Sequence, residues 1–177
     1  FIAHIKGKQS HPIVEQGLQI LRNLTHRGAV GADPLAGDGA GILIQMPDAF
    51  LRREFSQQDI QLPKNGDYAL GMLFLPRAAQ TRAVCEQVLA AVVKEEGQTF
   101  IGWRDVPTNN TRLGKGVQAV EPVVRQVCIG RGTSTPPKAF ERKLFVIRKF
   151  VEHRVRALDL PDKDMFYVPS LSSRTLV

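Results

Sequence analysis

The eight-residue run Tyr68–Leu75 constrains the fold more than any other segment, because it is almost entirely apolar. A strand of this kind has no polar face to turn toward water, so other parts of the chain must cover both of its faces. With 43% apolar residues among 177, the chain can bury a core that does so. We predict a strand inside a layered domain, with the amide hydrogens of 69–75 among the slowest to exchange.

Periodicity elsewhere predicts a mixture of helices and strands. Apolar residues at spacings of three and four predict helices, and short apolar runs between turn residues predict strands. The order lacks the regular alternation of a doubly wound sheet, which favours an α+β fold. Helices are predicted at 10–25, 48–55, 80–96 and 138–156, strands at 1–5, 40–45, 68–75, 100–106, 123–129, 165–168 and 171–177, and irregular structure at 111–122.

Several residues predict how two of these helices begin, end and pack. Ser10 is expected to cap the first helix, with Pro12 in its first turn, and Gly28 to end it in a left-handed conformation. Gly97 is expected to close the helix at 80–96. The core face of that helix is predicted to consist of Val84, Val88, Ala91 and Val92.

The net charge of +7 raises the question of nucleic-acid binding. Segment 138–156 carries seven Lys or Arg against two Glu, a local net charge of +5, on an amphipathic helix. A nucleic-acid groove would add interleaved aromatics or a known motif, so we predict a solvated or subunit-docking face and no nucleic acid. The apolar face of this helix is predicted to consist of Phe140, Leu144, Ile147, Val151 and Val155.

Cysteine and histidine usage predicts neither a disulfide nor a metal site. Cys85 lies in a helical pattern and Cys128 in a strand pattern, which favours two buried, reduced thiols. The four histidines are scattered without the spacing of metal ligands. No apolar run approaches the roughly 20 residues that cross a bilayer, and no signal-peptide pattern is seen, so we predict no membrane and a cytoplasmic location.

The most suggestive segments for chemistry are Thr25-His26-Arg27-Gly28 and the glycine-rich run 37–42. The second is predicted to be a tight loop that enters a strand, with glycines that allow close backbone approach. It lacks the Gly-Lys-Ser/Thr of a phosphate-binding loop, and its glycines precede a strand rather than the helix of a dinucleotide fingerprint. Asp38 alone is equally consistent with a turn residue that bonds its own backbone.

Together with other runs, these segments resemble the amidotransferase domain of glutamate synthase large subunits, a class II glutamine amidotransferase. The resemblance spans the chain from end to end. Gly-Trp-Arg-Asp-Val-Pro is specific to this family among glutamine amidotransferases, whereas His-Arg-Gly is shared more widely with the N-terminal-nucleophile class. The matching runs are 1–7, 20–29, 37–42, 71–75, 102–109, 166–168 and 170–175.

The resemblance implies a four-layer αββα sandwich of the N-terminal nucleophile hydrolase type, incomplete in a partial amidotransferase domain at 1–177. It also implies that an N-terminal Cys attacks the side-chain amide of glutamine, with its own α-amine as the base, giving glutamate and ammonia. In the family this Cys lies four residues before Phe1, so we expect no catalytic residue in this chain. The oxyanion donors, an Asn-Gly pair, are expected beyond Val177, and this fragment alone is predicted to be inactive.

The resemblance implies that this chain contributes residues that support the glutaminase site without carrying out the catalysis. Arg27 matches the Arg of His-Arg-Gly, where a guanidinium can orient groups around the Cys and favour its thiolate. The alternative is an Arg that bonds the last carbonyls of its helix. Gly28 belongs to the same motif, and Asp38, Gly39 and Gly41 match a segment expected to support the site structurally.

The resemblance further implies glutamate synthesis from ammonia and 2-oxoglutarate in the whole enzyme. FMN and an iron–sulfur cluster are implied for the full-length enzyme, with no cofactor in this domain. The implied partners are glutamine, the remaining domains of the polypeptide and a small electron-delivering subunit, in the cytoplasm or, in a photosynthetic eukaryote, the plastid stroma. Two alternatives stay open: a catalytically silent amidotransferase-like module that binds or scaffolds a partner, and, more weakly, a basic nucleic-acid-binding domain.

Overall fold

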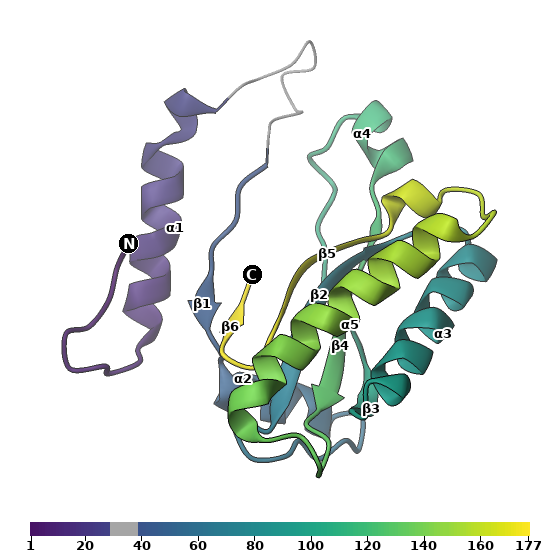
Figure 1. Ribbon diagram of the computed structural model, residues 1–177. Coiled ribbons are helices and arrows are strands. Elements are labelled where there is room, and N and C mark those ends of the chain that lie inside the picture. Colours follow the sequence, from purple (N-terminus) through teal and green to yellow (C-terminus); the bar gives the residue numbers. More distant parts are fainter. Residues whose placement is uncertain (29–38) are drawn as a thin grey trace. The chain divides into compact units, whose positions relative to one another are not determined.

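The computed structural model describes residues 1–28 and 39–177 and divides into two compact units (Figure 1). Unit 1 comprises Phe1–Ile44 and Asn109–Val120, and unit 2 comprises Gln45–Thr108 and Glu121–Val177. In the described residues, no helix combines the length and apolar character needed to cross a membrane. These residues also contain no cluster of His, Cys, Asp or Glu able to hold a metal ion.

The regular structure in the described part of unit 1 consists of helices and the first residue of β1. Helix α1 (His11–Asn23) begins after Ser10 in an extended conformation and carries a proline in its first turn, which confirms the predicted start. The predicted cap is wrong, because the Ser10 side chain makes no capping hydrogen bond. A single turn of 3₁₀ helix, η1 (Thr25–Arg27), follows it. The stretch predicted to be irregular contains one short helix, α4 (Lys115–Val120).

Two further predictions for unit 1 are wrong. Residues 1–5 form no strand; instead the Gly7 N–H donates to the His4 carbonyl at 2.8 Å, and the Lys6 N–H donates to His4 Nδ1 at 3.2 Å. The His4 side chain thus fixes a turn where alternation predicted an extended chain. Gly28 is extended, with φ −78° and ψ 146°, rather than left-handed. The 3₁₀ turn already bonds the final carbonyls of α1, so no left-handed stop is needed.

Unit 2 is built on a four-stranded sheet in the order β3-β4-β2-β5, with every neighbouring pair antiparallel. Strand β2 (Tyr68–Leu75) matches its predicted bounds and pairs on both sides, so it is an interior strand. Its neighbours are β4 (Val123–Gly130) and β5 (Tyr167–Ser172), and β3 (Thr99–Asp105) is an edge strand. Mixed helices with antiparallel sheets confirm the α+β class.

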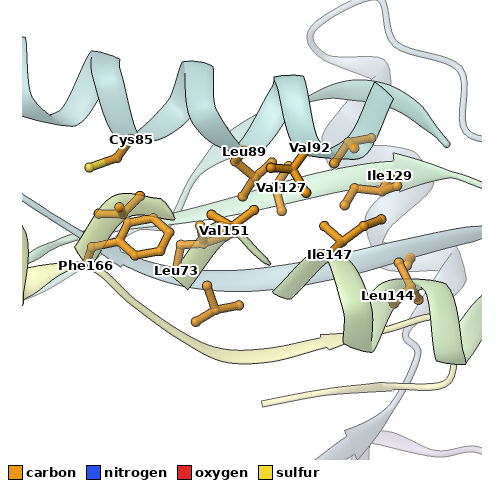
Figure 2. Close-up of a cluster of buried hydrophobic side chains, with 14 of the residues drawn as sticks. Leu73, Cys85, Leu89, Val92, Val127, Ile129, Leu144, Ile147, Val151 and Phe166 are labelled. Atoms are coloured by element: carbon orange, nitrogen blue, oxygen red, sulfur yellow. The ribbon is translucent and has the colours of Figure 1, made fainter. Parts of the chain in front are cut away.

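Two long helices cover one face of this sheet. Helices α3 (Ala79–Glu95) and α5 (Pro137–Ala157) pack on alternate residues of β2 and β4, among them Leu73 and Val127 (Figure 2). The predicted apolar face of α5 is confirmed at all five positions. Cys85 of α3 also belongs to this core. Both Cys85 and Cys128 are buried, and neither forms a disulfide.

The predicted core face of α3 is wrong in part. Val92 is buried, but Val84 and Val88 are only half-buried and Ala91 is exposed. The helix turns a different set of residues to the sheet because small and weakly polar side chains can occupy its core positions. That set is Thr81, Cys85, Leu89, Val92 and Val93.

The opposite face of the sheet is covered in part by α2 (Asp48–Ser56), close to its predicted bounds. Leu51 and Phe55 are fully buried there. The Tyr68 hydroxyl donates to Asp48 Oδ1 at 2.8 Å, and burial raises the pKa of this tyrosine. The Asp48 carboxylate also accepts from Arg52, whose hydrogen bond lowers the Asp48 pKa.

The segments that flank this framework form shorter elements than predicted. The strand expected at 40–45 is reduced to β1 (Ile44–Gln45), and the C-terminal strand to β6 (Thr175–Leu176). These two form a two-stranded sheet, and within unit 2 the Met46 N–H donates to the Arg174 carbonyl at 2.8 Å. A 3₁₀ turn, η2 (Lys163–Met165), replaces the start of the strand predicted at 165–168.

Candidate functional site

The end of α1 is capped by the side chains of Thr25 and His26. The Thr25 hydroxyl donates to the Arg22 carbonyl at 2.7 Å, and His26 Nδ1 lies 3.0 Å from the Asn23 carbonyl. The Leu24 N–H donates to the carbonyl four residues earlier at 3.0 Å. Side chains and backbone therefore satisfy the carbonyls that a helix end leaves without partners.

Arg27 follows directly and takes no part in this capping through its side chain. Its backbone N–H donates to the Leu24 carbonyl at 2.9 Å, and the Gly28 N–H donates to the Thr25 carbonyl at 3.1 Å. Arg27 is exposed, and its guanidinium bonds none of the carbonyls of α1. The structure therefore gives no support to the helix-capping alternative for Arg27, because Thr25 and His26 perform that role.

The other predicted support residues fall into two groups. Gly39 is exposed with φ +82°, a conformation that favours glycine, and Gly41 is exposed in a segment without regular secondary structure. Asp38 lies outside the described residues. Arg27, Gly28, Gly39 and Gly41 all belong to unit 1. No hydrogen bond between described residues joins the segment of Arg27 and Gly28 to the segment of Gly39 and Gly41. The predicted support residues thus lie in two places, Arg27 and Gly28 after α1, and Gly39 and Gly41 before β1.

The run Gly-Trp-Arg-Asp at 102–105 lies on β3 and has a structural role. Arg104 is 8% exposed; its guanidinium donates to Glu54 Oε2 at 2.7 Å and to Gln126 Oε1 at 3.0 Å, and lies 5.3 Å from the Phe50 ring centroid. It thereby ties α2 to the sheet. A Cβ added at Gly102 would lie 2.9 Å from Ile60 Cδ1, the movable end of a side chain, so this position is only mildly constrained.

Arg125 connects the same run to α3 from the helix-covered face. Its guanidinium donates to Asp105 at 2.6 Å and to Glu86 at 2.7 Å, and lies 5.2 Å from the Trp103 ring centroid. Glu86 and Trp103 also line a shallow groove of about 260 Å³ between α3 and β3. The groove lacks a convergent set of catalytic groups, since Glu86 is already engaged by Arg125.

One carboxylate that sequence reasoning passed over organises the run 170–175. Glu141 Oε1 accepts from the Ser173 N–H at 2.7 Å and from the Ser173 hydroxyl, and its other oxygen accepts from the Ser172 hydroxyl at 3.1 Å. Ser172 in turn accepts from the Arg174 N–H at 3.0 Å. The partners of Glu141 lie 31 and 32 residues away in the sequence, so no local pattern indicates these hydrogen bonds. The one signal in the sequence is that Glu141 is one of two Glu on a basic helix.

The sequence model of the class-II glutamine amidotransferases matches residues 1–177, the full chain. The chain belongs to this family. Among the similar curated proteins, the family member "Glutamate synthase [NADPH] large chain" of Bacillus subtilis is 46% identical over 178 residues, covering 99% of this chain and 11% of that protein. "Glutamate synthase [NADH]" of Schizosaccharomyces pombe is 38% identical, covering 100% and 8%.

A third relative, "Ferredoxin-dependent glutamate synthase 2" of Synechocystis, is 32% identical over 177 residues, covering 100% of this chain and 11% of its own length. The chain therefore spans about a tenth of the length of the curated relatives it matches. This confirms that the chain is a class-II amidotransferase domain homologous to part of glutamate synthase large chains.

Proposed function

We propose that the chain supplies part of the glutaminase site of a glutamate synthase, which hydrolyses glutamine to glutamate and ammonia and uses the ammonia with 2-oxoglutarate. The observation that carries this proposal is the family match, which includes every residue from 1 to 177. The names of the relatives support the second half of the reaction, because each is a glutamate synthase. Residues 1–177 then form part of the amidotransferase domain.

The nucleophile is proposed to be an N-terminal Cys four residues before Phe1, with its α-amine as the base. The two cysteines of this chain are unsuited to the role. Burial raises the pKa of the Cys85 thiol to about 11 and that of Cys128 to about 12, which suppresses the reactive thiolate near neutral pH. Both are internal residues in a packed core, so neither has a free α-amine beside it.

Arg27 is the residue of this chain that we assign to the site. Its exposed guanidinium bonds none of the α1 carbonyls, so it can orient the nucleophile and favour the thiolate electrostatically. Gly28, Asp38, Gly39 and Gly41 would hold the backbone around it. Glutamine is the proposed substrate, and the oxyanion donors would come from the polypeptide after Val177.

The sheet of unit 2 is proposed to be one layer of an αββα sandwich. One face is covered by α3 and α5, as that architecture requires. On the other face, beyond the reach of α2, Met72, Phe74 and Val124 are only half-buried. A second sheet packed on these residues would complete their burial and give the layered fold.

FMN and an iron–sulfur cluster are proposed for the rest of the polypeptide. The described residues do not fit a cluster, because cluster irons are held mainly by several Cys thiolates and this chain has two buried cysteines on different elements. The remaining synthase domains and a small electron-delivering subunit are the proposed partners, and the cytoplasm or plastid stroma is the proposed location.

A kinetic experiment separates this proposal from the alternative of a silent binding module. In the complete protein, Arg27→Ala should lower kcat/KM for ammonia release from glutamine by at least about tenfold, roughly 1.4 kcal/mol of transition-state stabilisation. Arg22→Ala is the matched control, since Arg22 is also exposed at the end of α1 and only its carbonyl is used in capping. Equal rates in both folded variants would leave Arg27 without a catalytic role, and no ammonia release from the wild-type protein would favour the silent module.

The 177-residue chain made by itself is proposed to be inactive. A polypeptide that begins with Phe1 has neither the thiolate nucleophile nor its base, and each missing oxyanion donor costs roughly a further 100-fold or more. Ammonia release from glutamine above the buffer rate would contradict this.

A further inference from the structure

Helix α5 exposes two large aromatic side chains on the side away from its core. Phe145 is 61% exposed and Phe150 is 47% exposed. Burying a phenylalanine side chain is more favourable than leaving it in water. The buried residues of the same helix already supply its contacts with the sheet, so neither phenylalanine is needed for the core of unit 2.

Cations accompany these aromatics. Residues 138, 142, 145, 149 and 156 are separated by four, three, four and seven positions, so they lie on one side of the helix. The Lys149 ammonium lies 6.0 Å from the Phe145 ring centroid. We define the outer face of α5 as Lys138, Arg142, Phe145, Lys149 and Arg156. Phe150, seven positions after Lys143 and four before Arg154, lies instead on the flank toward α3.

The charge of this face is not balanced within the described residues. Lys143 and Arg154, on the flank toward α3, pair with Glu96 at 2.9 Å and Glu95 at 2.6 Å. Lys149 shares the nearly buried Glu152 with Arg148. In contrast, Lys138, Arg142 and Arg156 form no ion pair with a carboxylate of residues 1–28 or 39–177. The outer face therefore combines exposed aromatic area with net positive charge.

We propose that the outer face of α5 docks on an acidic, partly apolar surface of the same polypeptide outside residues 1–177. Charge complementarity favours an acidic partner, and the exposed ring of Phe145 requires apolar area between the carboxylates. The chain spans about a tenth of its relatives, so ample surface lies outside it in a protein of their length. This inference rests on the proposed function only in taking the chain to be one part of such a long polypeptide.

Hydroxyl-radical footprinting of the complete protein tests whether the face is covered. Phe145 should be oxidised at least about threefold more slowly than its exposed fraction in this structure implies, since the centre of a docked interface excludes water. Leu43 is an internal reference, because it is 65% exposed and lies outside the outer face. Oxidation of Phe145 at the rate its exposure implies would overturn the proposal.

Photo-crosslinking identifies the occupant. A benzoylphenylalanine at position 145 of the complete protein should crosslink to an Asp- and Glu-rich peptide of the same polypeptide outside 1–177. The matched control places the same group at Ala91, an exposed position of the neighbouring helix α3. Mixing isotope-labelled and unlabelled protein separates the same molecule from a second copy. Crosslinks to a second copy, to nucleic acid, or in equal yield to the same peptides from position 91 would each overturn the proposal.

Charge reversal supplies a functional readout of the same contact. Arg142→Glu should abolish the position-145 crosslink, whereas Lys94→Glu on α3 should leave it intact. Ammonia release from glutamine is measured separately on the wild-type protein. A protein that crosslinks as expected but releases no ammonia would refute the proposed function and leave this inference standing.

Discussion

Removing the Arg104 side chain should destabilise unit 2 without impairing catalysis. Arg104 and Glu54 are 9% and 22% exposed in their side chains and lie 2.7 Å apart, and Gln126 accepts a second hydrogen bond. Arg104→Ala would leave Glu54 without its main partner in a largely buried setting. Breaking such a pair costs about 3 kcal/mol, toward the lower end of values measured for buried ion pairs because Glu54 keeps some access to water.

Native-state hydrogen exchange of β3 and β4 in the complete protein measures this loss. About 3 kcal/mol corresponds to a rise in exchange rate of roughly 100-fold at amides that open with the sheet. Arg53→Ala is the control, because Arg53 is 69% exposed, lies 3.8 Å from the same Glu54 and also faces Phe50. It should change exchange by less than about threefold, as a surface pair contributes little.

The reasoning fails if Arg104→Ala exchanges like Arg53→Ala, because the buried pair would then contribute nothing. It also fails if kcat/KM for glutamine in the folded variant falls by about tenfold or more. That second result would place the run at 102–105 in the catalytic machinery rather than in the framework.

Three further predictions follow from single contacts. Gly132→Ala should cost at least about 2 kcal/mol in thermal unfolding, since the added Cβ would lie 1.8 Å from the Gly97 carbonyl oxygen, whereas Gly116→Ala, at a position in helix α4 that meets no atom of another described segment within 4 Å, should not destabilise the protein. Glu141→Ala should speed exchange of the Ser173 amide by at least about tenfold, with Glu141→Gln retaining part of the protection. Cys85 and Cys128 should resist iodoacetamide at pH 8 until the protein unfolds. Their raised pKa values favour the neutral thiol, so they contribute stability below about pH 9 that is lost as the pH rises through about 11 and 12.

Strong, uninterrupted patterns in the sequence predicted the framework of unit 2. The apolar run of β2 and the apolar spacing of α5 each leave one way to bury their side chains, so bounds and core positions agree with prediction. The face of α3 was missed because its many small apolar residues fit more than one helical face, and contact with the sheet selects among them.

Local turn chemistry and distant polar partners explain the remaining differences. The alternation at 1–5 gave way to hydrogen bonds made by His4, and the 3₁₀ turn replaced a left-handed Gly28. The bonds of Arg104 and Glu141 join residues 22 to 50 positions apart, for which a single sequence gives no spacing signal. For the candidate site, the motif located Arg27, but only the structure showed that Thr25 and His26 cap the helix in its place.

Covalent labelling by a glutamine-like diazoketone tests the central claim most directly. Such a reagent captures an activated nucleophilic thiolate, so in the complete protein peptide mapping should find it on a single Cys four residues before Phe1, with loss of ammonia release in proportion. Label on Cys85 or Cys128, or full inactivation with no labelled residue before Phe1, would contradict the account of how this chain contributes to the hydrolysis of glutamine.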